Sequence, residues 1–311
     1  FIYQGSVSGI NNVAADTLEP NLVNIQFGLS VACAGDINGD GYSDVIVGAE
    51  NYDNTETDEG AAYVYFGSGT GINIIATAIL EINQAGAQMG RGVASAGDVN
   101  GDGYSDVIVG AYAYDNGQTN EGAAFVYHGS AAGINTSVAA TVESNQAGAQ
   151  LGVSVASAGD VNGDGYSDVI VGANQYDNGQ SAEGAAFVYH GSATGINTAA
   201  AATVECNQAG AQMGVSVASA GDVNGDGYSD VIVGANFYNN GQSAEGGAFV
   251  YHGSATGINT TSAATVESNQ AAANMGIAVA SAGDVNGDGY SDVIVGAYVY
   301  DNGQTNEGAA F

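Results

Sequence analysis

The chain has 311 residues, with 33 acidic residues against a single basic one, Arg91, which gives a formal net charge of −32. A negative charge of this size repels nucleic acid and anionic membranes and excludes both as direct partners. The many glycines would be compatible with disorder, but regular apolar runs such as those at 107–109 and 125–127 favour a packed fold. No apolar run of about 20 residues and no signal peptide is found, so we expect a mature domain or a segment, without membrane insertion.

The whole sequence repeats with a period of 62 residues. A fixed period decides the architecture, because each repeat is one structural unit. The chain begins and ends at the same phase of the repeat, after five periods: the residues at this phase are Phe1, Tyr63, Phe125, Phe187, Phe249 and Phe311.

The second repeat shows the expected elements most clearly. In chain order, we predict a small-residue strand at 93–96, an acidic loop at 98–106, a buried strand at 106–110, a loop with an Asn-Gly turn at 111–122, a strand at 123–128, a turn at 129–134, and a weaker strand at 139–143. Residues 145–150 lead into the next repeat. No segment shows a helical pattern.

Four short antiparallel strands per repeat are typical of a β-propeller blade. A linear β-solenoid is the alternative, but calcium-binding solenoids use much shorter repeats. We therefore predict an all-β fold, a single propeller domain over residues 1–311. The expected blades span about 27–83, 89–145, 151–207, 213–269, and 276–311 together with 1–20.

The shared phase of the two ends predicts how the ring closes. Residues 1–6 match the third strand at 125–130, and the chain also stops within a third strand at 307–311. We expect five closed blades, the last combining strands from both termini, with 293–295 paired to 2–3 so that apolar faces are buried. Phe1 and Phe311 compete for one slot in this arrangement. The alternative is a cut from a longer array of repeats.

The acidic loop Asp-Val-Asn-Gly-Asp-Gly-Tyr-Ser-Asp is the most informative motif, and it occurs five times if the first copy is included, which differs only by Ile37 at its second position. Its positions 1, 3, 5 and 9 carry oxygen side chains, which suit Ca²⁺, and the carbonyl of position 7 is the natural fifth protein ligand. We expect about five calcium ions, one per repeat. The expected ligands are Asp36, Asn38, Asp40, Tyr42 and Asp44; Asp98, Asn100, Asp102, Tyr104 and Asp106; Asp160, Asn162, Asp164, Tyr166 and Asp168; Asp222, Asn224, Asp226, Tyr228 and Asp230; and Asp284, Asn286, Asp288, Tyr290 and Asp292.

The loop departs from an EF-hand after nine positions. An EF-hand needs a bidentate Glu at position 12 and a helix on each side. Position 12 is Val109 in the second repeat, and the residues after the loop read as a strand, so we expect the loop to join two strands. The alternative is a hairpin turn rich in Asp and Asn that binds no metal.

Three elements together resemble the FG-GAP repeat of integrin α-subunit propellers and of bacterial surface proteins. The metal loop matches at every ligand position. The opening element is Phe27-Gly28, Met89-Gly90, Leu151-Gly152, Met213-Gly214 and Met275-Gly276. The closing Gly-Ala is at 48–49, 110–111, 172–173, 234–235 and 296–297, and the proline that should follow is replaced by Glu50, Tyr112, Asn174, Asn236 and Tyr298.

This resemblance implies a propeller whose calcium loops join strands one and two, on the face opposite the usual partner-binding face. It implies a calcium-binding protein, extracellular or on the cell surface, with a structural, adhesion or assembly role. The expected partner is a protein or a glycan on the opposite face, or another copy of the chain. Integrin-type propellers have seven blades, whereas this sequence holds five repeats.

The loop between the second and third strands also carries acids. They are Asp53 and Glu59, Asp115 and Glu121, Asp177 and Glu183, Glu245 alone, and Asp301 and Glu307. A second cation or a partner is one reading. We favour a solvated loop whose Glu caps backbone N–H groups.

Histidines, tyrosines and cysteines recur or stand alone without forming a convergent site. His128, His190 and His252 lie on different repeats, so we expect them at the surface. One tyrosine recurs in the loop after the second strand of each repeat: Tyr52, Tyr114, Tyr176, Tyr238 and Tyr300. These tyrosines either form an aromatic ring that binds sugars or, as we favour, pack between blades. Cys33 and Cys206 belong to different repeats and are not expected to form a disulfide.

Nothing in the sequence indicates catalysis, so we do not expect an enzyme. Catalytic sites break the symmetry of repeats, whereas this chain preserves it, and one basic residue cannot supply the cations that stabilise developing negative charge. The alternatives to a structural or adhesion role are a carbohydrate-binding, lectin-like propeller and a non-catalytic module of a larger secreted enzyme.

Overall fold

The computed structural model describes all 311 residues, and it consists of strands and loops. A short hairpin, β1 (Gly5–Ser6) and β2 (Gly9–Ile10), precedes five sheets, each built from consecutive antiparallel strands. No helix of the length and apolarity needed to cross a bilayer is present. The sheets are β3 (Phe27–Gly35), β4 (Asp44–Ala49), β5 (Ala61–Tyr65) and β6 (Ala78–Glu81); β7 (Met89–Gly97), β8 (Asp106–Ala111), β9 (Ala123–Tyr127) and β10 (Ala140–Glu143); β11 (Leu151–Gly159), β12 (Asp168–Ala173), β13 (Ala185–Tyr189) and β14 (Ala202–Glu205); β15 (Met213–Gly221), β16 (Asp230–Ala235), β17 (Gly247–Tyr251) and β18 (Ala264–Glu267); and β19 (Met275–Gly283), β20 (Asp292–Ala297) and β21 (Ala309–Ala310).

The predicted four-stranded antiparallel repeat is confirmed, with one difference in the first strand. We expected a strand at 93–96, but β7 begins at Met89 because Gly90 adopts a φ of 90° that permits a bulge. The register between β7 and β8 shifts between Met89 and Gly92 and again between Ser95 and Gly97. The bulge therefore extends the inner strand while keeping its small residues opposite the buried strand β8.

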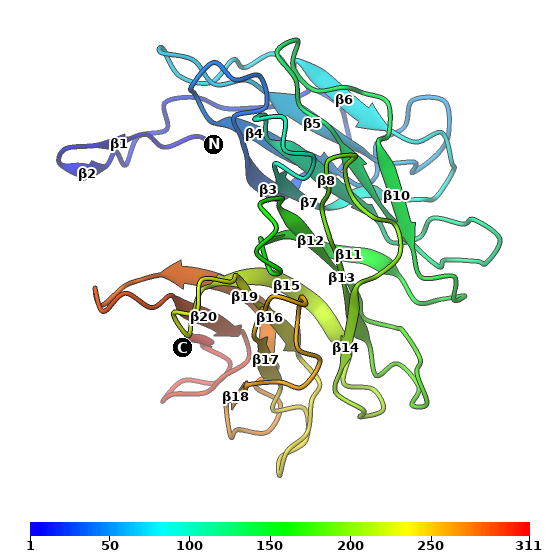
Figure 1. The fold of residues 1–311 in the computed structure, drawn as a ribbon, viewed down its shortest axis with the longest axis vertical. Helices are drawn as coiled ribbons and strands as arrows, with labels where there is room; N and C mark the ends of the chain where they lie inside the picture. Colours follow the sequence, from blue (N-terminus) through cyan, green and yellow to red (C-terminus); the bar gives the residue numbers. More distant parts are fainter.

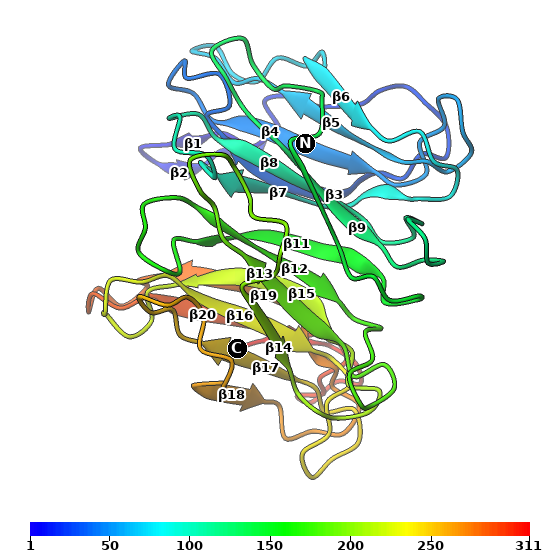
Figure 2. The same cartoon turned by 45° about the vertical axis from the view of Figure 1, so that its right-hand side comes forward.

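The sheets stand side by side in an arc, with the first strands β3, β7, β11, β15 and β19 in contact with one another from sheet to sheet (Figures 1 and 2). The core lies between adjacent sheets. One cluster, for example, joins Ile108 and Val126 of the second sheet to Val169, Val171 and Phe187 of the third. The apolar run of β8 is buried along its whole length because it has a sheet on each side.

Glycines set the distance between neighbouring sheets. A Cβ built on Gly110 of β8 would overlap the carbonyl oxygen of Gly152 in β11. Gly48, Gly172 and Gly234 meet the following sheet in the same way. Because each contact is made by backbone atoms, the same spacing repeats at all four interfaces between sheets.

The predicted closure of the ring is not formed in this structure, and the pairing of 293–295 with 2–3 is wrong. Val295 instead exchanges two backbone hydrogen bonds with Phe311, at 3.0 and 2.9 Å. Ile2 forms a bridge with Asp16, within the N-terminal segment. The two ends of the arc remain apart (Figure 1). The repeated glycine contacts give a physical reason, because bringing the ends together would require every interface to change its spacing.

Candidate metal centres

The five acidic loops all join the first strand of a sheet to the second, so they lie on one face of the arc. In the second loop, the Asp98 carboxylate accepts hydrogen bonds from the N–H groups of Gly101, Asp102 and Gly103, at 2.7, 3.1 and 2.8 Å. Gly101 and Gly103 adopt φ values of 73° and 88°, a region that favours glycine. The backbone therefore wraps around the first carboxylate of the loop.

Positions 3, 5 and 7 continue this wrapping. The side-chain oxygen Oδ1 of Asn100 accepts a hydrogen bond from the backbone N–H of Asp102 at 2.9 Å, and the side-chain Nδ2 of Asn100 donates one to the Asp102 carboxylate at 3.0 Å. The other Asp102 oxygen accepts from the Tyr104 N–H at 3.0 Å. The Tyr104 carbonyl accepts no backbone hydrogen bond. The loop thus presents oxygen donors on its exposed side and keeps one carbonyl unpaired.

The Asp at position 9 has a role that sequence reasoning missed. Asp106 is fully buried, and its two oxygens accept from the N–H groups of Val99 and Gly129, each at 2.9 Å. Burial raises the pKa of Asp106 to about 6, although these two hydrogen bonds oppose the rise. Asp168 shows the same arrangement and also has a pKa raised by burial to about 6. This carboxylate therefore ties the start of the loop to the turn after the third strand.

The donor set fits calcium in its chemistry, since it consists of carboxylate, amide and carbonyl oxygens. In the structure, however, no group of three or more His, Cys, Asp or Glu side chains is gathered closely enough to hold an ion. The reason lies at position 9, where both oxygens of Asp106 are turned to backbone N–H groups. Each carboxylate oxygen has a second lone pair, so this bonding is compatible with an ion. The 25 ligands stay a prediction.

Neighbouring loops are bonded directly to one another. The N–H of Ser105, at position 8 of the second loop, donates to the carbonyl of Asp36 at position 1 of the first, at 3.0 Å. The Ser105 hydroxyl accepts from the Asp36 N–H at 3.2 Å. The same backbone bond links the later loops, from Ser167 to Asp98, Ser229 to Asp160 and Ser291 to Asp222. The five loops therefore form one continuous strip.

The tyrosine at position 7 completes each link. A Cβ built on Gly101 would lie 2.6 Å from the ring of Tyr166, so the ring covers the glycine at position 4 of the preceding loop. Tyr42 belongs to the first loop, has no preceding loop to cover, and is 45% exposed.

We expect Tyr166→Ala to lower the free energy of unfolding by about 2 kcal/mol, because it uncovers the glycine and removes buried ring area. Tyr42→Ala makes the same chemical change without that contact and should cost about 1 kcal/mol less. Denaturant unfolding of both variants measures the difference. Equal losses would show that the ring does not link the loops.

The opposite face carries the loops between second and third strands, and the expected exposed loop with a capping Glu is found there, as at 115–120 of the second repeat. Glu121 does cap the backbone, accepting from the Asn116 N–H at 2.6 Å. The burial of the capping side chain itself was not expected: Glu59, Glu121, Glu183 and Glu245 are all fully buried. The loop folds over its own capping Glu and removes it from solvent. The sequence of the loop is polar and contains glycine, so it gave no signal of this burial.

A glutamine clamp between sheets on this face was not expected. The Gln84 side chain donates to the Asp115 carbonyl at 2.8 Å and accepts from the Asp115 N–H at 2.7 Å. Gln146, Gln208 and Gln270 make equivalent bonds to Asp177, Asn239 and Asp301. The recurrence of glutamine at a fixed place in the repeat was the signal that could have revealed it.

The histidines and tyrosines are packing residues. His128 was expected at the surface, but its ring is half-buried. The ring packs against Gly195 of the next repeat: a Cβ added to Gly195 would lie 2.9 Å from the His128 Nε2 atom. Phe66 covers Gly133 in the same way, so the position serves packing between repeats. Tyr114 packs edge-on against Phe125 of its own sheet, with ring centroids 5.3 Å apart, and also against the cluster between the first and second sheets, as we favoured. Cys33 and Cys206 are free, as expected.

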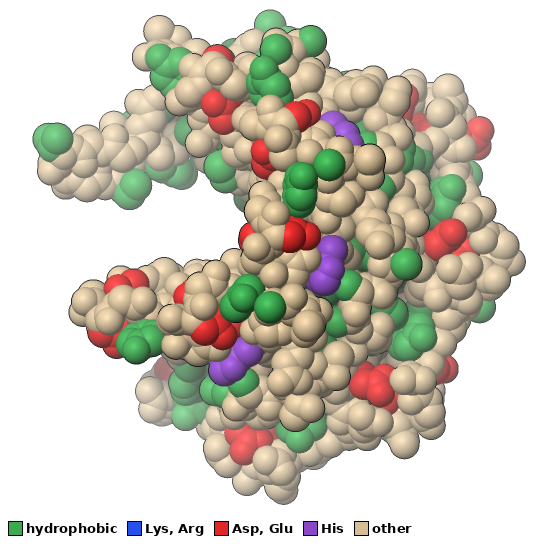
Figure 3. Space-filling model, in the orientation of Figure 1, with side chains coloured by type: hydrophobic (Ala, Val, Ile, Leu, Met, Phe, Trp, Pro, Cys, Tyr) green, Lys and Arg blue, Asp and Glu red, His purple; other side chains and the backbone are tan.

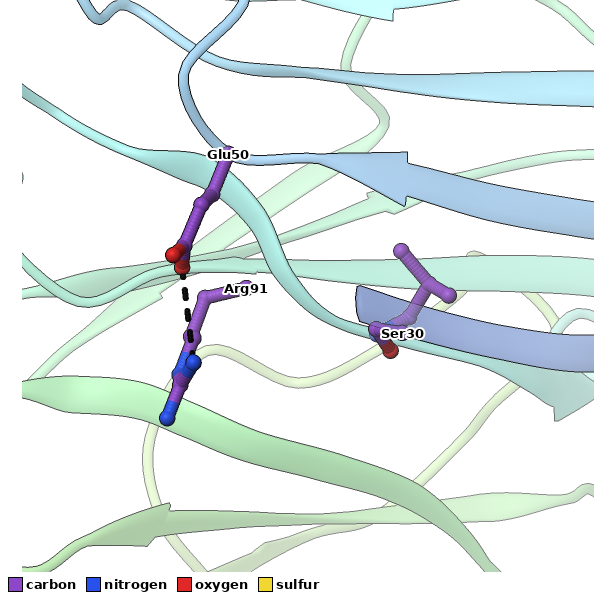
Figure 4. Close-up of polar contacts among 4 residues, drawn as sticks. Ser30, Glu50 and Arg91 are labelled. Carbon is purple, nitrogen blue, oxygen red and sulfur yellow. Dashed lines mark hydrogen bonds and ion pairs between the residues drawn. The ribbon is translucent and has the colours of Figure 1, made fainter. Parts of the chain in front are cut away.

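The only basic side chain is paired with an acid from the neighbouring sheet. The Arg91 guanidinium lies 3.6 Å from the Glu50 carboxylate, near Ser30 on the inner side of the arc (Figure 4). Glu50 is largely buried, whereas Arg91 is 41% exposed. The Ser30 hydroxyl accepts from the Val93 N–H at 3.1 Å. The pair neutralises the one cation of the chain.

A fan of four-stranded sheets with an Asp-rich loop between the first two strands defines a class of repeat β-propellers. The family model "FG-GAP repeat" matches residues 27–65, 89–127 and 151–189, and the model "FG-GAP-like repeat" matches residues 222–295. The chain belongs to the FG-GAP repeat family.

Integrin α subunits are among its relatives. The chain is 36% identical over 155 residues to integrin alpha-4 of Xenopus laevis, covering 47% of this chain and 14% of that protein. It is 32% identical over 218 residues to integrin alpha pat-2 of Caenorhabditis briggsae, covering 65% and 17%. It is 38% identical over 152 residues to integrin alpha-6 of Gallus gallus, covering 47% and 13%. The matched part is thus less than a fifth of each relative.

Proposed function

We propose that this protein is a non-enzymatic, calcium-stabilised propeller that acts outside the cell or at its surface, in adhesion or assembly. The observation that carries the proposal is the strip of five acidic loops with the same residues at every expected ligand position, each wrapped around its first carboxylate and each with one unpaired carbonyl. Similarity to integrin α subunits supports the adhesion role.

Calcium at each loop would be held by the side chains of positions 1, 3, 5 and 9 and by the carbonyl of position 7. Its charge would offset the repulsion between carboxylates, which at a few ångströms costs on the order of 1 kcal/mol or more per pair. The buried Asp106, whose pKa is raised by desolvation, would be held ionised by the ion. We propose extracellular placement because sites of about 10⁻⁴–10⁻³ M are filled at the millimolar calcium found there.

The face opposite the calcium loops is the proposed place for a protein or glycan partner. Its loops are held by buried glutamates and by the Gln84-type clamps, so they present a fixed surface. A preformed surface binds without the cost of ordering loops. The tyrosines of these loops pack against third-strand rings such as Phe125, which favours a protein partner over a ring of sugar-stacking aromatics.

Calcium titration of dialysed protein should find close to five sites, with dissociation constants of about 10⁻⁴–10⁻³ M. Asp164→Ala should remove one site, because it deletes a carboxylate from the third loop. Glu19→Gln removes one exposed charge outside the loops and should leave the stoichiometry unchanged. Isothermal titration calorimetry measures both. Two sites or fewer in the unaltered chain would refute the proposal, and constants far below micromolar would point to an intracellular protein.

A further inference from the structure

The dipeptide Asn-Gly recurs in two kinds of loop within the repeats. In this dipeptide the Gly nitrogen can attack the carbonyl carbon of the Asn side chain, because glycine has no side chain that hinders the approach. The pairs are 38–39, 100–101, 162–163, 224–225 and 286–287 in the acidic loops, and 116–117, 178–179, 240–241 and 302–303 in the loops between second and third strands. Whether a pair reacts in the folded chain depends on whether its Gly N–H is free.

In the acidic loops the glycine nitrogen is occupied. The Gly101 N–H donates to the Asp98 carboxylate at 2.7 Å. The same bond is made in three other loops by Gly39, Gly163 and Gly225. The Asn100 side chain is held as well, because both its oxygen and its nitrogen are bonded to Asp102. The attacking nitrogen and the carbon that it must reach are therefore both fixed.

In the loops between second and third strands the glycine nitrogen is free. The Gly117 N–H donates no hydrogen bond to another group of the protein, and Asn116 and Gly117 are both exposed. The pairs at 178–179 and 240–241 share both properties. The Asn116 side chain is anchored only by its Nδ2, which donates to the Glu143 carboxylate at 2.8 Å. The nucleophile of these pairs is therefore available in the folded chain.

We propose that Asn116, Asn178 and Asn240 are sites of spontaneous deamidation, with water as the only co-reactant. The Gly117 nitrogen bonds to Cγ of Asn116, the Cγ–Nδ2 bond breaks, and the proton of the Gly117 N–H leaves with Nδ2 as ammonia. Water then opens the resulting cyclic imide at either of its carbonyls, which gives aspartate or isoaspartate. The net change replaces the side-chain amide by a carboxylate and involves no oxidant or reductant.

The reaction removes a contact that holds the loop. Asn116 loses the nitrogen that donates to Glu143, and the new carboxylate repels the carboxylate of Glu143. Isoaspartate also adds a carbon to the backbone of a loop whose Asn116 N–H is bonded to the buried Glu121. The new charge has no free cation to pair with, because Arg91 is already bound to Glu50, and the face shown in Figure 3 carries acidic and no basic side chains. Each event therefore loosens the loop around Glu121.

The first repeat supplies an internal control at the same place. Asn54 has the same backbone bond to a buried glutamate, Glu59, at 2.7 Å, and the same side-chain bond to a fourth-strand glutamate, Glu81, at 3.0 Å. It is followed, however, by Thr55, whose β-branched side chain crowds the nitrogen. The Thr55 N–H also donates to Glu59, at 3.3 Å. We expect Asn54 to stay unmodified.

The test is peptide mapping by mass spectrometry of the whole chain, kept in calcium-containing buffer at mildly alkaline pH, which promotes loss of the Gly N–H proton. Deamidation raises the mass of a peptide by about 1 Da. A sample unfolded in urea gives the rate that each local sequence sets by itself. Asp98→Ala removes the acceptor of the Gly101 N–H, and Asp98→Asn is the matched control, because it keeps a side-chain oxygen that accepts this bond.

In the folded chain we expect the three exposed sites to react at least roughly tenfold faster than Asn100 and Asn162, because a hydrogen bond to a carboxylate must break before a masked nitrogen can attack. In urea all these sites should react at similar rates. In Asp98→Ala, Asn100 should approach the rate of Asn116, whereas in Asp98→Asn it should stay slower. Asn162 should remain protected in both variants, which shows that the rest of the chain is folded.

Three results would overturn the proposal. They are equal rates at Asn100 and Asn116 in the folded chain, a difference between them that persists in urea, and an Asn100 that stays equally slow in Asp98→Ala and Asp98→Asn. None of these results depends on the number of calcium sites, so the proposal and the calcium proposal fail separately.

Discussion

Removal of calcium should lower the melting temperature by roughly 20 °C at low ionic strength. Five sites that are occupied at about 100 times their dissociation constant each stabilise the folded state by about 2.7 kcal/mol. For a chain of 311 residues, the unfolding entropy converts the sum into a shift of that size. Thermal unfolding followed by circular dichroism in excess chelator, and again in 10 mM calcium, measures it.

Magnesium at the same ionic strength is the control for this experiment. Magnesium requires near-octahedral geometry and dehydrates reluctantly, so it should restore much less stability than calcium. If calcium stabilised the protein only by screening its −32 charge, magnesium or sodium chloride at the same ionic strength would raise the melting temperature equally. A melting curve that does not change in chelator would contradict a stabilising role for the ion.

A single methyl group at Gly110, or at the equivalent glycine of another sheet interface, should be strongly destabilising. Gly110→Ala would drive a Cβ into the carbonyl of Gly152 in the next sheet, and neither backbone can yield without moving a whole sheet. We expect a loss of about 3 kcal/mol or more in the free energy of unfolding, because overpacking against backbone cannot be relieved by a rotamer change.

Gly296→Ala provides a matched control within the same protein. Gly296 occupies the position of Gly110 in the last sheet, where no further sheet packs against it in this structure. A Cβ added to Gly296 would meet only the Cβ of Ala278, at 3.6 Å, which is an ordinary contact distance. This substitution should change stability by less than about 1 kcal/mol. Chemical denaturation of both variants gives the comparison, and similar losses would show that the cost comes from the strand and not from the interface.

The repeated sheet was predictable from sequence because its signals are local. The Val-Ile-Val run of β8 and the Asp-Gly-rich loop before it identify a buried strand and a tight turn without knowledge of neighbours. The loop motif also predicts the candidate ligands, since Asp98, Asn100 and Asp102 lie at alternate positions of one short loop; the hydrogen bonds among them are local, and their role as ligands stays a prediction.

The features that sequence reasoning missed all depend on the neighbouring repeat. The burial of Glu121, the contact of His128 with Gly195 and the clamp from Gln84 to Asp115 each join residues that only the folded arc brings together. Closure failed for the same reason. The phase shared by Phe1 and Phe311 led to the predicted pairing of 293–295 with 2–3, but the spacing between sheets, which the sequence does not show, keeps these segments apart.

Because each complete sheet is built from one continuous stretch of chain, the arc has a simple response to mechanical force. A pull on both ends would load the end sheets first, since neither is locked by a strand from the other terminus. Sheets would peel away in sequence, and each complete repeat would release 62 residues, or roughly 200 Å of extended chain. The strip of bonded loops would resist each step, so the molecule would extend under tension in equal increments.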